Sequence, residues 1–383
     1  MLQRKNKKIK IFQAFAGIGS QYRALQNVGK QKGWDIESVG IIEWYVDAII
    51  GYQAIHDFPK DIYKDSFDAK ENTLSANSKI PWSKKGVLKS ELAFWINRSQ
   101  SKFNNMFDIK SVKGESIPKD IDIFTYSFPS QDLSNQGLKK GIDKRSNNRS
   151  GILWQIERIF KEMSISMQPT EMPKYLLMEN VYGLKDKSNE KNYEKWISFL
   201  NKLGYVSHEY VVNAKDFGLP QNRKRIFLLS IRKDLKKDWN FKFKELETSE
   251  SKPILKDVLR NNQQNIKYIT GYELTEFRKR GPSYVADLEN FSSFVSERVV
   301  FDSNAVGPTL TASGALSRIK VHDNGDIRIL SPLEATLYMG FTEKDYDNLV
   351  NSDFLSDNKI VFLMGNSIPI NSLEAILKTL EFN

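Results

Sequence analysis

Residues 120–137 read Asp-Ile-Asp-Ile-Phe-Thr-Tyr-Ser-Phe-Pro-Ser-Gln-Asp-Leu-Ser-Asn-Gln-Gly. The apolar and aromatic residues from Ile121 to Tyr126 predict a short buried strand. Pro129 ends this strand because proline has no N–H for the sheet ladder, and a polar loop follows from Ser130 onward. Open α/β sheets bind their ligands at loops of this kind, at the carboxyl ends of parallel strands. The stretch therefore predicts an α/β fold whose chemistry lies on the loop at Ser130.

Composition and charge narrow the class of protein. The chain has 383 residues, with 57 Lys or Arg against 47 Asp or Glu, and a formal net charge of +10. This length predicts a large domain and a smaller one, and the positive charge suits either a polyanionic partner or plain solubility. There is no cysteine, and the three histidines are scattered, so we expect neither disulfides nor a metal site. No long apolar run follows the basic N-terminus, which predicts a cytoplasmic protein without a membrane span. We also expect a monomer.

The N-terminal residues predict a strand, a glycine-rich turn and a helix in succession. The strand is expected at residues 8–13, and the turn contains Phe15, Gly17, Ile18 and Gly19. Glycines let the backbone approach a ligand, and the N-terminus of the following helix presents free N–H groups. The pattern indicates a nucleotide-binding turn, with a plain tight turn as the alternative.

A second predicted strand, residues 39–42, ends in Glu43 and Trp44. An acidic residue in this place binds ribose hydroxyls in nucleotide-binding sheets, and an indole can lie against adenine. The turn lacks the third glycine of dinucleotide sites and the lysine of triphosphate loops, so S-adenosylmethionine fits it better. Asp108 and Ile109 are expected to end a third strand and reach the adenine, unless Asp108 is a turn aspartate.

The middle of the chain supplies a loop, a helix and an acidic strand end. Residues 137–150 are rich in Lys, Arg, Asn and Gly, which predicts a mobile basic loop. Residues 151–163 have the apolar spacing of a helix, with Ser150 as its cap. Residues 175–178 predict a buried strand that ends at Glu179. Because a buried carboxylate is costly unless it is paired, Glu179 is predicted to be functional, with a helix-capping acid as the alternative.

The second half of the chain begins with two arginines and then changes in character. Arg223 and Arg225 precede a predicted strand at residues 226–230 and point the same way if the chain is extended; an exposed basic edge is the alternative. Residues 233–324 are polar and predict a separate domain. Within it, residues 307–315 have small and hydroxyl side chains that suit close approach to a groove, or form turns and strand edges.

Taken in this order, the motifs resemble those of the cytosine-5 DNA methyltransferases. The pieces that carry the resemblance are Phe15-Ala16-Gly17-Ile18-Gly19, Glu43-Trp44, Phe128-Pro129-Ser130-Gln131, Glu179-Asn180-Val181, Gln221-Asn222-Arg223-Lys224-Arg225, Arg328 to Gly340-Phe341, and Gly365-Asn366-Ser367. They extend over nearly the whole chain. Longer runs at residues 126–129, 172–181 and 309–315 are similar to the mollicute enzymes that methylate the dinucleotide CG, which implies CG specificity.

The resemblance implies a fold, a cofactor and a partner. It implies a Rossmann-like α/β domain that uses S-adenosyl-L-methionine, and a smaller target-recognition domain of mostly irregular and β structure, with duplex DNA held between them. The catalytic and cofactor-binding domain is expected at residues 1–232 and the target-recognition domain at 233–327. Residues 328–383 are expected to form a hinge and to return to the first domain.

The resemblance also implies a role for individual residues. Those implied in catalysis on a flipped cytosine are Pro129, Ser130, Glu179, Asn180, Arg223 and Arg225. Those implied in cofactor binding are Phe15, Gly17, Ile18, Gly19, Glu43, Trp44, Asp108, Ile109, Leu153, Asn366 and Ser367. Those expected to contact DNA are Gln131, Gln136, Lys139, Lys140, Arg149, Thr311, Ser313, Gly314, Ala315 and Arg318.

The chain departs from the family pattern at the nucleophile. The family attacks C6 of cytosine with a cysteine, whereas Ser130 stands in that position here. A hydroxyl is far less acidic than a thiol and needs a base to activate it, so we expect strongly reduced activity. Two other functions stay open on this fold: a DNA-binding protein that no longer methylates, and an RNA cytosine-5 methyltransferase.

Overall fold

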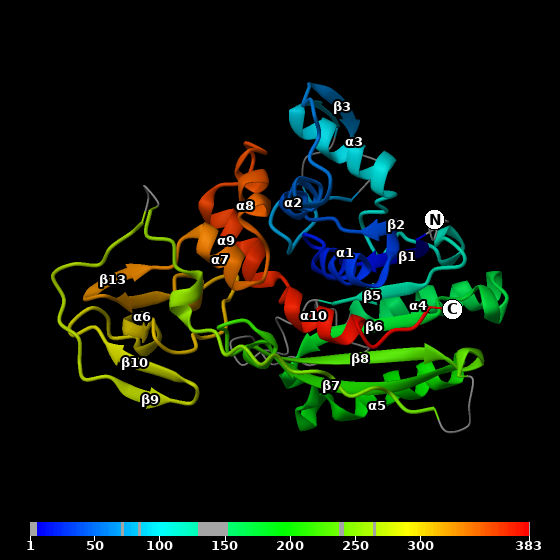
Figure 1. The fold of residues 1–383 in the computed structure, drawn as a ribbon. Helices are drawn as coiled ribbons and strands as arrows, with labels where there is room; N and C mark the ends of the chain where they lie inside the picture. The colour runs from blue at the N-terminus through cyan, green and yellow to red at the C-terminus, as the bar shows by residue number, and fades with distance from the viewer. Residues whose placement is uncertain are drawn as a thin grey trace, which may run out of the picture.

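A computed structural model describes residues 6–69, 73–82, 86–128, 152–236, 241–262 and 266–382. Within these ranges six strands form the larger sheet, in the order β2-β1-β5-β6-β8-β7 (Figure 1). The parallel strands are β1 (Lys7–Ala14), β2 (Trp34–Ile42), β5 (Ile123–Tyr126) and β6 (Tyr175–Val181). The strands that complete the sheet in antiparallel pairing are β8 (Lys224–Arg232) and β7 (Tyr205–Asn213). The predicted α/β class is confirmed, and the strand predicted from residues 121–126 lies between β1 and β6.

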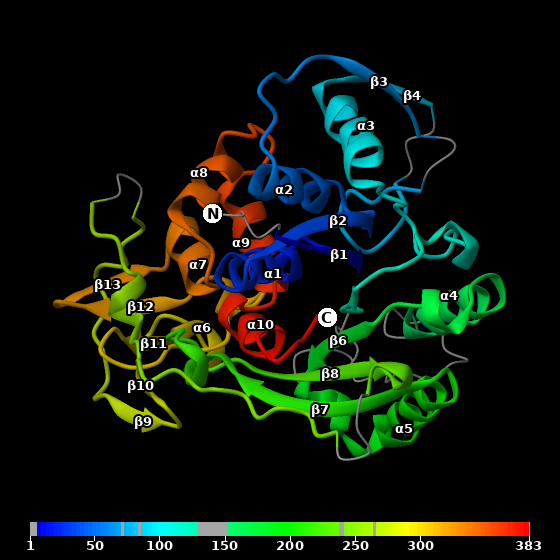
Figure 2. The same ribbon diagram turned by 45° about the vertical axis from the view of Figure 1, so that its right-hand side comes forward.

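Helices cover both faces of the larger sheet because successive side chains of each strand point to opposite faces. On β6, Leu177 belongs to the core beneath one pair of helices, and Leu176 belongs to the core beneath the other pair. The helices on the first face are α1 (Ser20–Lys32) and α10 (Ile370–Leu377), and those on the second are α4 (Leu153–Ser166) and α5 (Lys187–Lys202). The result is a three-layer α/β/α arrangement (Figure 2).

One predicted strand is longer in the structure, and another is not formed. Strand β6 does not stop at residue 178 but continues to Val181, because β8 pairs with it as far as Arg225. Glu179 therefore lies inside the strand, opposite Phe227 and two residues before the strand ends. The predicted third strand is also missing from the described residues: after α3 (Glu91–Phe103) the chain makes an isolated bridge to β2, and Asp108 lies beyond it in a turn.

The helix predicted at residues 151–163 begins two residues later and runs further. Helix α4 starts at Leu153, with Ile152 in the N-cap position, and ends at Ser166. Ser150, the predicted cap, lies outside the described residues.

The chain between β2 and β5 forms a separate unit beside the larger sheet. Helix α2 (Val46–His56) follows β2 directly, and beyond it a two-stranded hairpin, β3 (Asp65–Asp68) and β4 (Val87–Ser90), packs on α3. Figures 1 and 2 show this unit at the edge of the molecule.

The smaller sheet has the order β13-β12-β11-β10-β9 in the described ranges. Its elements are β9 (Arg278–Arg280), β10 (Ser283–Asp287), the short helix α6 (Val295–Arg298), β11 (Val299–Asp302), β12 (Lys320–Asp323) and β13 (Asp326–Ile329). Strands β11 and β12 run parallel, and the other pairs are antiparallel. The expected domain limit between residues 327 and 328 falls inside β13, and the division into domains remains a prediction.

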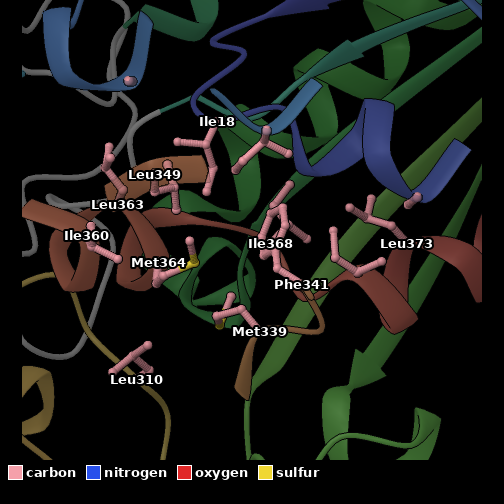
Figure 3. Close-up of a cluster of buried hydrophobic side chains, with 14 of the residues drawn as sticks. Ile18, Leu310, Met339, Phe341, Leu349, Ile360, Leu363, Met364, Ile368 and Leu373 are labelled. Carbon is pink, nitrogen blue, oxygen red and sulfur yellow. The ribbon is translucent and has the colours of Figure 1, made fainter. Parts of the chain in front are cut away.

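Three helices that follow β13 lie between the two sheets (Figure 1). They are α7 (Pro332–Tyr338), α8 (Glu343–Val350) and α9 (Asp357–Asn366). Capping boxes start two of them, with Ser331 and Thr342 as the N-caps. Figure 3 shows one buried cluster that combines Ile18 near the N-terminus with Leu310 and with residues of these helices. The stretch Asp357–Leu377 is long and apolar enough to cross a membrane, but it comprises two helices, α9 and α10, and 67% of an apolar 18-residue part of it is buried inside the fold.

Candidate functional site

A cavity of about 540 Å³ lies at the carboxyl end of the parallel strands. Residues that follow β1, β2 and β5 meet there with the last residues of β6, because parallel strands present their carboxyl ends at one edge of a sheet. The predicted site residues that line this cavity are Phe15, Gly17, Ile18, Glu43, Trp44, Asp108, Ile109, Glu179, Asn180, Arg223, Arg225, Asn366 and Ser367.

The turn after β1 is fixed to the end of β2 by the carboxylate of Glu43. The Gly17 N–H donates to its Oε2 at 2.8 Å, and the Tyr45 N–H donates to its Oε1 at 2.7 Å. Gly17 has a φ of 56°, which a residue with a Cβ adopts only with strain. Burial raises the pKa of Glu43, and the hydrogen bonds from Tyr45 and Gly17 oppose that rise. The carboxyl group is thus held rigidly at the cavity wall.

A turn that the sequence did not reveal forms another part of the wall. Ser75 pairs with the chain beside Trp44: its N–H donates to the Trp44 carbonyl at 2.8 Å, and its own carbonyl accepts from Val46 N–H at 2.9 Å. These bonds bring Ser78, Lys79 and Pro81 to the cavity. The segment has no periodicity that predicts an element, so only its pairing in the fold discloses it.

The residues around Asp108 reach the cavity from a turn and not from a strand. The Asp108 Oδ1 accepts the Lys110 N–H at 3.0 Å, which is the turn-aspartate alternative. At the start of α4 the wall consists of Ile152, Trp154 and Gln155, whereas Leu153 is fully buried behind them in the core. Trp154 and Gln155 were missed because their helical spacing is equally typical of packing.

A buried carboxyl group on β6 and a buried guanidinium group on β8 face each other. The Arg225 Nε lies 3.2 Å from Glu179 Oε1, with only 14% and 11% of the two side chains exposed. Arg225 is two residues from Phe227, the partner of Glu179, so both charged side chains project from the same face of the sheet. Burial raises the pKa of Glu179, and the guanidinium groups of Arg225 and Arg223 oppose that rise. Burial and the guanidinium groups thus act in opposite directions on this carboxyl group.

Arg223 also lines the cavity, but its guanidinium is engaged elsewhere. It donates to the main-chain carbonyls of Leu310, Gly365 and Ser367. Arg223 and Arg225 are predicted to point the same way. Both line the cavity, but only Arg225 forms the ion pair with Glu179 there. Asn180 fixes the end of β5, because its Nδ2 donates to the Phe128 carbonyl at 3.2 Å.

The remaining predicted residues lie elsewhere. Pro129, Ser130, Gln131, Gln136, Lys139, Lys140 and Arg149 are outside the described residues. Thr311, Ser313, Gly314, Ala315 and Arg318 lie around a short 3₁₀ helix, Ala315–Ser317, beside the smaller sheet and not in the cavity wall. There the Thr311 hydroxyl donates to the Ser313 carbonyl at 2.8 Å, and Arg318 forms an ion pair with Glu297 at 3.1 Å.

Comparison with known proteins identifies relatives over the whole chain. The family model described as C-5 cytosine-specific DNA methylase matches residues 75–381. The chain is 41% identical to the orphan methyltransferase M.SssI of Spiroplasma monobiae, with 98% of each sequence covered. It is 30% identical to the type II methyltransferase M2.ScrFI of Lactococcus lactis subsp. cremoris, with 97% of this chain and 99% of the relative covered. The S. pombe Dnmt2 methyltransferase structure has a TM-score of 0.62 at 15% identity, with 97% of both chains covered, and supports the fold.

Proposed function

Because the chain belongs to the C-5 cytosine-specific DNA methylase family, we propose that it transfers a methyl group from S-adenosylmethionine to C5 of a flipped cytosine in CG sites of duplex DNA. The observation that carries the proposal is that one cavity contains both the Gly17–Glu43 pair and the Glu179–Arg225 pair. The first pair suits a nucleoside, and the second suits a polar base. CG specificity rests on the resemblance of residues 126–129, 172–181 and 309–315 to mollicute enzymes.

The residues of one part of the cavity fit S-adenosylmethionine. Glu43 presents a fixed carboxylate for ribose hydroxyls, and the half-buried indole of Trp44 offers a face to the adenine. Asp108 and Ile109 line the same cavity and would meet the adenine edge. Asn366 and Ser367, from the C-terminal part of the chain, also line it. When bound, the cofactor supplies an electrophilic methyl group on a sulfonium.

The other part of the cavity fits a cytosine taken out of the duplex. A base in a helical stack cannot present C5 and C6 to protein groups, so it must be flipped. A protonated Glu179 would donate to N3 and accept from the exocyclic amine, which its raised pKa favours. Arg225 would donate to O2 and stabilise the charge that develops there. Arg223 and Asn180 hold neighbouring backbone and would shape the site.

C5 of cytosine is itself a poor nucleophile toward a methyl group. The reaction therefore needs a protein nucleophile that first attacks C6. Attack at C6 makes C5 enamine-like; C5 then takes the methyl group, the C5 proton is removed, and the bond to C6 breaks. Ser130 stands where the family has cysteine. Each pKa unit of the nucleophile above the working pH costs about 1.4 kcal/mol to ionise it, and the sequence offers no histidine near Ser130 to act as its base. The proposed activity is therefore strongly reduced in this chain.

The substitution Ser130→Cys tests the proposal. Initial rates on a CG duplex should rise by orders of magnitude, while affinities for DNA and cofactor change little, because serine and cysteine differ by one atom. The cysteine variant should also form a stable adduct with a duplex carrying 5-fluorocytosine, and the serine form should bind without one. Equal rates for the two forms would show that residue 130 is not the nucleophile position.

The choice of substrate tests the alternatives. Methyl transfer from labelled cofactor to a CG duplex, to a duplex with an altered site and to tRNA should favour the CG duplex in the cysteine variant. Preferential labelling of tRNA would support the RNA alternative. Binding without labelling, even with cysteine in place, would support a DNA-binding protein.

A further inference from the structure

His56 lies against the glycine-rich turn and is not among the residues that line the cavity. It is the last residue of α2, and its Nε2 lies 3.0 Å from the Ile18 carbonyl oxygen. Gly19 packs so closely on the ring that a Cβ there would lie 2.2 Å from Nε2, and its φ of 78° also favours glycine. Imidazole and turn are therefore fitted to each other.

We propose that His56 is a positioning residue for cofactor binding, because it holds the Ile18 carbonyl behind the turn and so keeps the cavity side of the turn in its binding conformation. The inference rests on the proposed function, since it assumes that the cofactor binds at this turn. It adds a residue that makes no contact with the cavity and that neither the motifs nor the cavity lining indicates.

The ring has one chemical form that fits this place. A carbonyl oxygen only accepts hydrogen bonds, so Nε2 must carry the proton. Nδ1 is buried, and among the described residues it has no hydrogen-bond partner. A second proton on Nδ1 would therefore leave a buried donor unsatisfied. The neutral Nε2–H tautomer is the form that donates to Ile18, and burial together with the neighbouring Arg23 lowers the pKa of His56 to about 3.

Aromatic neighbours hold the ring at the correct angle. The ring centroids of Tyr52 and Tyr22 lie 4.6 Å and 4.9 Å from that of His56. The Tyr52 hydroxyl accepts from Gln13 Nε2 at 2.7 Å and lies 3.2 Å from Ser38 Oγ, so Tyr52 is fixed to β1 and β2. The position of the imidazole is thereby set by the larger sheet.

The peptide between Ile18 and Gly19 is the part of the turn that needs this support. The Ile18 side chain is anchored in the core against Leu363 and Gly51 (Figure 3), and Gly17 is held by Glu43. Glycine at position 19 lets the intervening peptide rotate at low steric cost. Without the His56 donor, the Ile18 carbonyl loses its partner, and the peptide is free to turn toward the cavity.

Paired substitutions separate positioning from plain stability. His56→Gln keeps an amide N–H donor near the place of Nε2, whereas His56→Leu removes it. Dissociation constants for S-adenosylmethionine and S-adenosylhomocysteine, measured by calorimetry on the full chain, should rise about tenfold in His56→Leu and stay near the wild-type value in His56→Gln. Affinity for a CG duplex without cofactor should not change in either variant.

A matched control lies three residues earlier on the same helix. Gln53 is fully buried and donates to the Trp95 carbonyl at 2.8 Å, away from the turn. Gln53→Leu should lower the melting temperature at least as much as His56→Leu, yet leave cofactor affinity unchanged. Equal weakening by His56→Leu and His56→Gln, or unchanged affinity in His56→Leu, would overturn the inference. Failure of the wild-type chain to bind the cofactor would instead overturn the proposed function.

Discussion

The Nη1 of Arg223 lies 2.6 Å from the carbonyl oxygen of Leu310. This hydrogen bond joins the chain just before β8 to the chain beside the smaller sheet. The same guanidinium donates through Nη2 to the carbonyls of Gly365 and Ser367 at 3.1 Å and 2.8 Å, and the residue is only 4% exposed. Arg223 therefore ties three separate segments together at the cavity, and it is more a tether than a group for substrate.

Replacement of Arg223 should weaken the whole assembly. Lysine has no planar fork and cannot reach three carbonyls in these directions, so Arg223→Lys should lower the free energy of unfolding by about 3 kcal/mol and reduce the affinities for both cofactor and DNA. Urea unfolding and calorimetry measure these effects. The neighbouring exposed Lys224 provides the control, since Lys224→Met loses only a contact with the Tyr182 ring. An Arg223→Lys protein as stable as wild type would contradict the tether.

Replacement of Glu43 should act on the cofactor and not on DNA. Glu43→Ala removes the acceptor of two backbone N–H groups and the proposed ribose contact, so the dissociation constant for S-adenosylmethionine should rise at least about tenfold. Glu43→Gln should be intermediate, because an amide has one oxygen for two donors. Calorimetry gives the constants. Glu37→Ala on β2, the strand before Glu43, loses only an exposed pair with Lys8 and should leave them unchanged. Unchanged affinity in Glu43→Ala would exclude a cofactor role.

The buried imidazole of His56 should make stability sensitive to acid. Its pKa is lowered to about 3 in the folded chain and is about 6.5 when unfolded, so its contribution is complete above pH 6.5 and is lost as the pH falls toward 3. The charged or titratable groups that face the ring are Arg23, Tyr22 and Tyr52. Of these, Arg23 disfavours the imidazolium further.

The measurement is the difference in unfolding free energy between wild type and His56→Gln at pH 7 and at pH 5. Wild type should lose about 2 kcal/mol more than the variant over this interval, since the slope is about 1.4 kcal/mol per pH unit. The carboxyl groups titrate equally in both proteins, so their contribution cancels in this difference. Identical losses in the two proteins would show that the ring titrates normally.

DNA affinity should fall steeply with salt because the sequence between residues 137 and 150 is basic. Each phosphate contact that is removed lowers the slope of log affinity against log salt by about 0.9, so joint replacement of Lys139, Lys140 and Arg149 by Gln should flatten the slope by up to about 3. Binding to a CG duplex at several salt concentrations measures it. Replacement of the exposed Lys187, Lys191 and Lys195 on α5 by Gln is the matched control and should leave the slope unchanged. An equal change in both triple variants would make the effect one of net charge alone.

The amino-acid sequence determined the class of fold and the places where chemistry is carried. The apolar run at residues 121–126 contains β5, and polar residues follow β1, β2 and β5 in the sequence, because hydrophobic periodicity is a local property that the chain itself encodes. Glu43 and Glu179 could be singled out in the same way, since a carboxylate next to a buried strand is costly without a purpose.

Only the tertiary structure decided which of these groups meet. The contact between Glu179 and Arg225 depends on the antiparallel pairing of β8 with β6, and the tether from Arg223 spans 87 residues to Leu310 and 144 to Ser367. The part of the cavity wall that Ser75 holds in place, and the hydrogen bond between His56 and Ile18, likewise arise from packing. Neither Ser75 nor His56 lies in a motif. Such contacts depend on the order and direction of strands and on the shape of neighbouring surfaces, and no local pattern of residues specifies them.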